Sequence, residues 1–129
     1  MNNNEKYRIM RCYFNLCCNA SLNKVLKQFS KGYGYCIGEI MLIFGDDPDE
    51  NNPEYETDFP EILGYDGVGF FSEHFPEPLL ISYQKFYNNL KKYTKEYILS
   101  RDDDFQKQAK YYLSLIRDRY NLIDEGEDI

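Results

Sequence analysis

The sequence contains no tryptophan, one histidine and no stretch of about eighteen consecutive apolar residues. Without such a stretch, a transmembrane helix is not expected, and we predict no membrane partner. The first six residues lack the basic end and apolar core of a secretory signal, so we expect a cytoplasmic protein. The four cysteines are Cys12, Cys17, Cys18 and Cys36, and their spacing fits neither a disulfide framework nor a CxxC metal knuckle. We therefore expect reduced cysteines that pack as small, buried apolar side chains.

Little in the sequence supports catalysis. The one histidine, His74, precedes two prolines and has no nucleophile elbow near it, so we interpret it as a surface turn residue. The Gly-x-Gly fragments at residues 32–34 and 67–69 lack the helix start and the basic residue of a phosphate-binding loop. They predict a helix end and a strand with close backbone approach. We therefore predict a protein that is not an enzyme, with no catalytic residue and no cofactor.

Calcium binding is the strongest metal-site alternative. An EF-hand loop would use positions 1, 3, 5 and 12, which correspond here to Asp47, Asp49, Asn51 and Asp58. However, Asn52 replaces the turn glycine, Pro53 follows it, and aspartate at the last position is shorter than the usual glutamate. We therefore assign no metal ligand.

Lys and Arg are absent from residues 32–84, although the chain has fifteen of them. The same segment holds twelve acids: Glu39, Asp46, Asp47, Asp49, Glu50, Glu54, Glu56, Asp58, Glu61, Asp66, Glu73 and Glu77. Residues 1–31 hold six basic residues and one acid, and residues 85–129 hold nine of each sign. The net charge of −7 argues against nucleic acid as a direct partner, because phosphates bind basic surface. It favours a basic protein partner, the alternative being an acidic segment that serves only solubility.

The C-terminal half predicts two amphipathic helices. From Ser82, a suitable N-cap, apolar residues recur at helical spacing through Ile98. A second helix follows the acids at 102–104, which suit the positive end of a helix dipole. A short loop between them predicts an antiparallel pair. The acidic residues 124–129 are expected to form a frayed tail.

The N-terminal half predicts a helix and several strands. Ser21 can cap a helix that carries apolar residues from Leu22 to Phe29 and ends at Gly32 or Gly34. The pattern at residues 8–18 leaves a strand and a helix equally open. Apolar runs predict strands at 40–44, 68–72 and 79–81. With 129 residues, the chain is expected to form one α+β domain, a small antiparallel sheet of three or four strands packed with helices.

The connection between Gly45 and Gly67 is unusually long for a compact domain. It carries most of the acidic residues but also apolar ones, which either fold back onto the core or contact a partner. We predict partner binding by Asp46, Asp47, Asp49, Glu50, Glu54, Tyr55, Glu56, Asp58, Phe59, Glu61, Tyr65 and Asp66. Carboxylates would cover a basic cleft and speed association, and the aromatic residues would anchor the complex.

Residues 59–71 and 80–87, with the two helices that follow, resemble immunity proteins of bacterial contact-dependent growth inhibition (CDI), the CdiI family. The most specific parts are Tyr-Asp-Gly-Val at 65–68 and Ile-Ser-Tyr at 81–83. The resemblance covers about residues 20–120. Within the family, the chain looks most like the group that neutralises ribonuclease toxins. It implies a cytosolic protein that binds the C-terminal nuclease domain of a cognate CdiA toxin. The long acidic connection and the Cys17-Cys18 pair depart from the family pattern.

Two alternatives stay open at this point. The chain could be another acidic interaction module, such as a nucleic-acid mimic or a regulator of a different basic protein. The interface could also be the helical face around Lys91 and Lys95 rather than the acidic connection.

Overall fold

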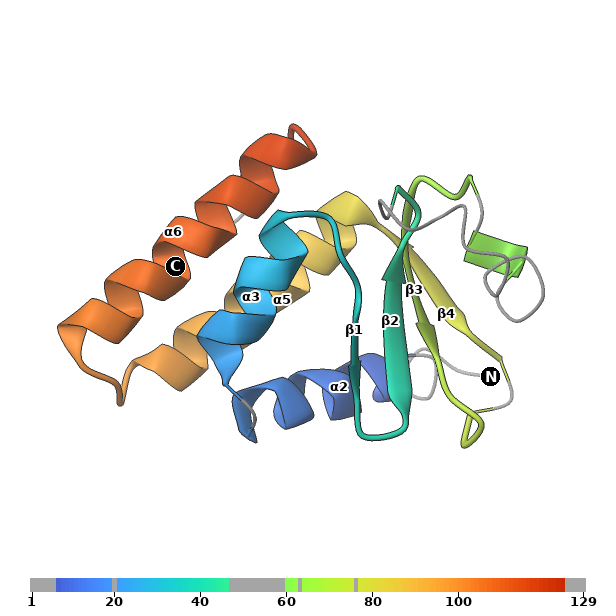
Figure 1. The fold of residues 1–129 in the computed structure, drawn as a ribbon, viewed down its shortest axis with the longest axis horizontal. Coiled ribbons are helices and arrows are strands. Elements are labelled where there is room, and N and C mark those ends of the chain that lie inside the picture. Colours follow the sequence, from blue (N-terminus) through green and yellow to red (C-terminus); the bar gives the residue numbers. More distant parts are fainter. Residues whose placement is uncertain (1–6, 20, 47–59, 63, 76, 125–129) are drawn as a thin grey trace.

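The computed structural model describes residues 7–19, 21–46, 60–62, 64–75 and 77–124 and has the predicted α+β architecture. Four strands form an antiparallel sheet in chain order: β1 (Tyr35–Ile37), β2 (Ile40–Phe44), β3 (Gly67–Phe71) and β4 (Leu79–Ser82). The helices are α2 (Arg8–Asn19), α3 (Leu22–Ser30), α5 (Tyr83–Ile98) and α6 (Asp103–Arg119). Helices α2, α3 and α5 contact the sheet, and α6 packs against α3 and α5 on the side away from it (Figure 1).

Both C-terminal helices begin where the sequence predicts. The Ser82 hydroxyl accepts a hydrogen bond from the Lys85 backbone N–H at 3.2 Å. The Asp102 carboxylate accepts one from the Phe105 N–H at 2.8 Å. Each cap satisfies an N–H group that has no partner within its own helix. The two helices run antiparallel, as Figure 1 shows, which confirms the predicted pair.

The N-terminal region forms two helices, which decides the open question at residues 8–18 in favour of a helix. Buried residues of α2 recur at helical spacing and include Tyr13 and Phe14. Ser21 occupies the N-cap position of α3, but its side chain makes no capping hydrogen bond, contrary to expectation. After α3, Gly32 adopts a φ of +81°, which confirms the predicted helix end, since glycine enters this region without a Cβ clash.

The sheet confirms the strand at 40–44, shifts the one predicted at 68–72 by one residue, extends the one predicted at 79–81 by one residue, and adds β1. Side chains alternate between its two faces. Leu42, Phe44, Val68 and Phe70 face the helices. There the ring centroid of Phe86 in α5 lies 5.5–6.4 Å from the ring centroids of Phe14, Phe29, Phe44 and Phe70. This aromatic contact set joins the sheet to three helices.

The opposite face of the sheet carries a second, smaller apolar cluster. Ile43 and Phe71 pack with Ile62 of the short 3-10 helix η1 (Pro60–Ile62). Met41, Tyr65 and Leu80 are partly buried around them. The alternative in which the apolar residues of the connection fold back onto the core therefore holds for Ile62 and Tyr65.

The described cysteines Cys12, Cys17 and Cys36 form no disulfide bond. Cys17 is buried, but Cys36 is exposed on the edge strand β1, so the expectation of buried cysteines is wrong for Cys36. In the part of the chain that the structure describes, no helix is long and apolar enough to cross a membrane.

Candidate functional site

The two ends of the acidic connection meet at one end of the sheet. The Gly45 N–H donates a hydrogen bond to the Gly67 carbonyl at 2.8 Å. A Cβ added to Gly45 would lie 1.8 Å from the Tyr65 carbonyl oxygen, so no larger residue fits between these backbones. Asp46, which follows β2, and Asp66, which precedes β3, are therefore held at the same end of the sheet.

Asp46 is tied to both C-terminal helices. The hydroxyls of Tyr120 and Tyr83 donate hydrogen bonds to Asp46 Oδ1 at 2.8 and 3.1 Å. The Arg119 guanidinium lies 3.6 Å from Oδ2. The two tyrosine rings stack with centroids 3.9 Å apart. Burial, reinforced by the neighbouring Asp46 carboxylate, raises the pKa of both tyrosines, so that their hydroxyls remain donors.

Glu61, Tyr65 and Asp66 are the other predicted site residues that the structure describes. The two carboxylates are exposed, and neither makes a hydrogen bond or ion pair with another described residue. Tyr65 is half-buried against the outer apolar cluster of the sheet. Tyr65 and Asp66 lie beside the Gly45–Gly67 closure, at the same end of the sheet as Asp46, while Glu61 belongs to η1, which packs through Ile62 on the outer face of the sheet. The remaining predicted residues lie outside the described ones: Asp47, Asp49, Glu50, Glu54, Tyr55, Glu56, Asp58 and Phe59.

Acidic residues also lie in the turns at the opposite end of the sheet. Glu39 is in the β1–β2 turn and contacts His74 in the β3–β4 connection. Both side chains are exposed, which confirms His74 as a surface turn residue. Glu73 and Glu77 flank that histidine and are exposed. Every described acid between residues 32 and 84 is thus exposed, while every described Lys and Arg lies in a helix or next to one.

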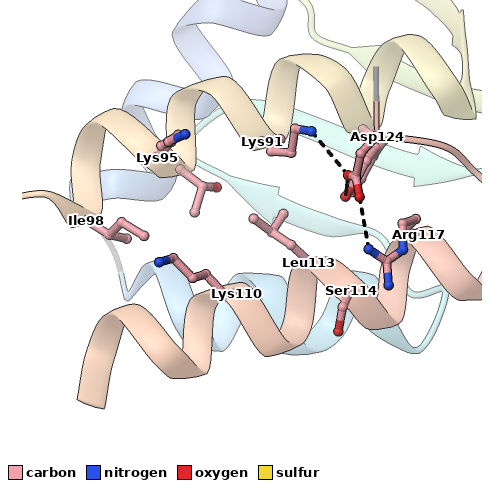
Figure 2. A pocket seen from close by; sticks show the side chains of 10 residues that line it. Lys91, Lys95, Ile98, Lys110, Leu113, Ser114, Arg117 and Asp124 are labelled. Carbon is pink, nitrogen blue, oxygen red and sulfur yellow. Dashed lines mark hydrogen bonds and ion pairs between the residues drawn. The ribbon is translucent and has the colours of Figure 1, made fainter. Parts of the chain in front are cut away.

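A cleft between α5 and α6, with a volume of about 240 Å³, was not predicted as a site. Lys91, Lys95, Lys110 and Arg117 line it, with Asp124 at one end (Figure 2). The Asp124 carboxylate accepts hydrogen bonds from Tyr87 Oη at 2.5 Å, Lys91 Nζ at 3.1 Å and Arg117 Nη1 at 3.0 Å.

These hydrogen bonds lower the pKa of Asp124 from 3.8 to about 2, and the bond from the Tyr87 hydroxyl has the largest effect. Asp124, the first residue of the tail that was expected to fray, is therefore held in place. In this region the sequence indicated only Lys91 and Lys95, as an alternative interface. The contact of Asp124 with α5 and α6 could not be predicted because it depends on the tertiary fold.

The described residues contain no group of three His, Cys, Asp or Glu that could hold a metal ion. The residues of the EF-hand alternative lie outside the described ranges.

Comparison with known proteins places the chain in a family. A family model for CDI immunity proteins matches residues 6–113, a span that begins just before α2, includes the whole sheet and ends within α6. No curated protein and no solved structure matches the chain. The family predicted from the segment around residues 59–87 is confirmed. The chain belongs to the CDI immunity protein family, and its function is to neutralise a cognate toxin by binding it.

Proposed function

We propose that the cognate toxin is a nuclease, specifically a ribonuclease, and that the acidic end of the sheet covers its basic active-site cleft. The observation that supports this most directly is the separation of charge. Residues 32–84, which include all four strands, contain no Lys or Arg, and their described acids are exposed, while the described Lys and Arg lie in the helices or next to them. Nucleases bind phosphates through positive clefts, so an exclusively acidic surface is their electrostatic complement. The resemblance to immunity proteins of ribonuclease toxins supports the choice of RNA.

The described part of the contact surface would divide its roles among four residues. Glu61 and Asp66 are exposed and have no described hydrogen-bond or ion-pair partner, so their carboxylates can pair with toxin cations. Tyr65 is backed by buried Ile62, which holds its ring for an apolar contact at the centre of the interface. Asp46 already accepts two tyrosine hydroxyls, so we assign it to holding the start of the connection rather than to direct contact.

Inhibition would follow from occupying the cleft. Carboxylates at the positions of RNA phosphates exclude the substrate, and complementary charge raises the association rate. Because exposed charges are screened by salt, association should slow as ionic strength rises.

A matched pair of double variants tests the position of the contact. Glu61→Gln with Asp66→Asn and Glu73→Gln with Glu77→Gln change the net charge equally, but the first pair lies in the acidic connection and the second in the β3–β4 turn. We expect the first variant to weaken binding of the cognate toxin domain by about tenfold, measured by stopped-flow mixing and calorimetry. The second variant should change affinity much less. Equal effects would mean that only total charge matters and would overturn the assigned surface.

A cleavage assay tests the nuclease assignment separately. The purified toxin domain should degrade RNA, and one equivalent of the immunity protein should stop the degradation. A toxin that binds the chain tightly but cleaves no nucleic acid would overturn the nuclease assignment and leave the family function intact.

A further inference from the structure

The cleft between α5 and α6 is basic although the chain as a whole is acidic. Four cations line it against one carboxylate, that of Asp124. Figure 2 shows two groups of cations within it. Lys91 and Arg117 point to Asp124, whereas Lys95 from α5 and Lys110 from α6 lie at the other end, near Ile98. The cleft lies outside the acidic surface proposed for toxin binding, and its interpretation does not depend on that proposal.

One end of the cleft shows what it binds. The Asp124 carboxylate is held by a hydroxyl, an ammonium and a guanidinium, all at 3.1 Å or less. Charge-assisted hydrogen bonds of this kind are the stronger ones in proteins. The Asp124 side chain is thus a carboxylate of the polypeptide itself, bound between the two helices by one neutral donor and two cations.

The other end of the cleft brings together a similar set of groups, one hydroxyl and two ammonium groups. Thr94 lines the cleft and has a buried hydroxyl with no hydrogen-bond partner among the described residues. A buried donor without an acceptor is costly, and native proteins seldom leave one. Lys95 and Lys110 supply two cations, and Lys110 has no ion pair with any described residue. Ile98 and Leu113 provide apolar walls, which strengthen electrostatic contacts by excluding water.

We propose that the Lys95–Lys110 end of the cleft binds a second carboxylate, supplied by an acidic side chain of a protein partner. Thr94, Lys95 and Lys110 would play the parts that Tyr87, Lys91 and Arg117 play for Asp124. The volume of about 240 Å³ admits a side chain but not a folded element. The carboxylate already bound beside it belongs to a peptide, which favours an acidic side chain over a free phosphate.

The test is a titration of the ¹⁵N-labelled full chain with a tetraglutamate peptide, followed by NMR. The amide signals of Thr94, Ile98 and Leu113 should shift, and tetraglutamine at the same concentration should leave them unchanged. Equal shifts with tetraglutamine, or none with tetraglutamate, would overturn the proposal. Inorganic phosphate that moves these signals as strongly as tetraglutamate would replace the carboxylate site with a general anion site.

Two double variants on the same helices locate the binding. Lys95→Gln with Lys110→Gln should weaken tetraglutamate binding by about fivefold. Lys92→Gln with Lys107→Gln makes the same charge change at exposed positions that do not line the cleft, and should have little effect. Equal weakening by both pairs would show that the peptide responds only to total charge and would overturn the site.

A third variant tests the buried hydroxyl. Thr94→Val preserves the shape of the side chain and removes only its donor, so we expect binding to weaken by about threefold. The amide spectrum of this variant without peptide should match that of the parent apart from residues near position 94. Unchanged tetraglutamate affinity in a folded Thr94→Val chain would contradict the part given to this hydroxyl.

Discussion

Replacing Asp46 with alanine should destabilise the fold as well as any complex. The change removes the acceptor of two tyrosine hydrogen bonds and the ion pair with Arg119. A hydrogen bond contributes about 1 kcal/mol net, and the higher value for charged acceptors does not apply because the Asp46 side chain is 47% exposed, which also makes the ion pair weak. We therefore expect a loss of about 2 kcal/mol in the free energy of unfolding, and a coupling of about 1 kcal/mol between Asp46→Ala and Tyr120→Phe.

Urea denaturation followed by far-UV circular dichroism measures this loss, since the chain has no tryptophan to report unfolding by fluorescence. With a slope of about 1–3 kcal/mol per molar urea, the midpoint of Asp46→Ala should fall by about 1 M. Glu61→Ala is the control, because Glu61 is an exposed acid with no described partner and should cost less than about 0.5 kcal/mol. A double-mutant cycle in which Asp46→Ala and Tyr120→Phe add without coupling would refute the assignment of Asp46 as a structural link.

Three further results are expected. Gly67→Ala would place a Cβ 2.1 Å from the Ile81 carbonyl oxygen, so thermal unfolding should show a loss of at least about 3 kcal/mol. The pKa of Asp124 is lowered to about 2, so its stabilisation is complete above pH 3.8 and is lost as the pH falls toward 2. Solvent screening limits it to about 1 kcal/mol, and the difference in urea midpoint between the parent and Asp124→Asn should vanish near pH 2. Ellman's reagent should modify exposed Cys36 much faster than buried Cys17, and a fast phase that survives in Cys36→Ser would contradict this.

The sequence predicted those parts of the fold that depend on local patterns. Both C-terminal helices have long apolar periodicity and a capping residue, and both begin at the predicted positions. Strand β1 was missed because three residues beside glycines are too few to show alternation. Helix α2 remained undecided because a short apolar stretch at residues 8–18 suits either structure until its neighbours are known.

The candidate sites also contain features that the sequence predicts and features that depend on the fold. The acidic character of residues 32–84 is a property of composition, so it was visible in the sequence. The partners of Asp46 were not, because Tyr83 and Tyr120 follow it by 37 and 74 residues. Asp124 likewise meets Lys91 across 33 residues, and only the antiparallel packing of α5 and α6 brings them together. Charge can be read from sequence, whereas neutralisation by a distant partner requires the fold.

The hydrogen bond from Gly45 to Gly67 makes the integrity of the sheet independent of the length of the connection that it closes. The entropy of closing a flexible loop grows only with the logarithm of its length, so doubling the connection would cost about 0.6 kcal/mol. Insertions or deletions between Asp46 and Pro60 can therefore leave the pairing of Phe44 with Val68, the hydrogen bonds of Asp46 and the packing of Ile62 in place. An immunity protein must follow a toxin that diverges. This closure would let the length of the connection change with the toxin while the sheet keeps its register.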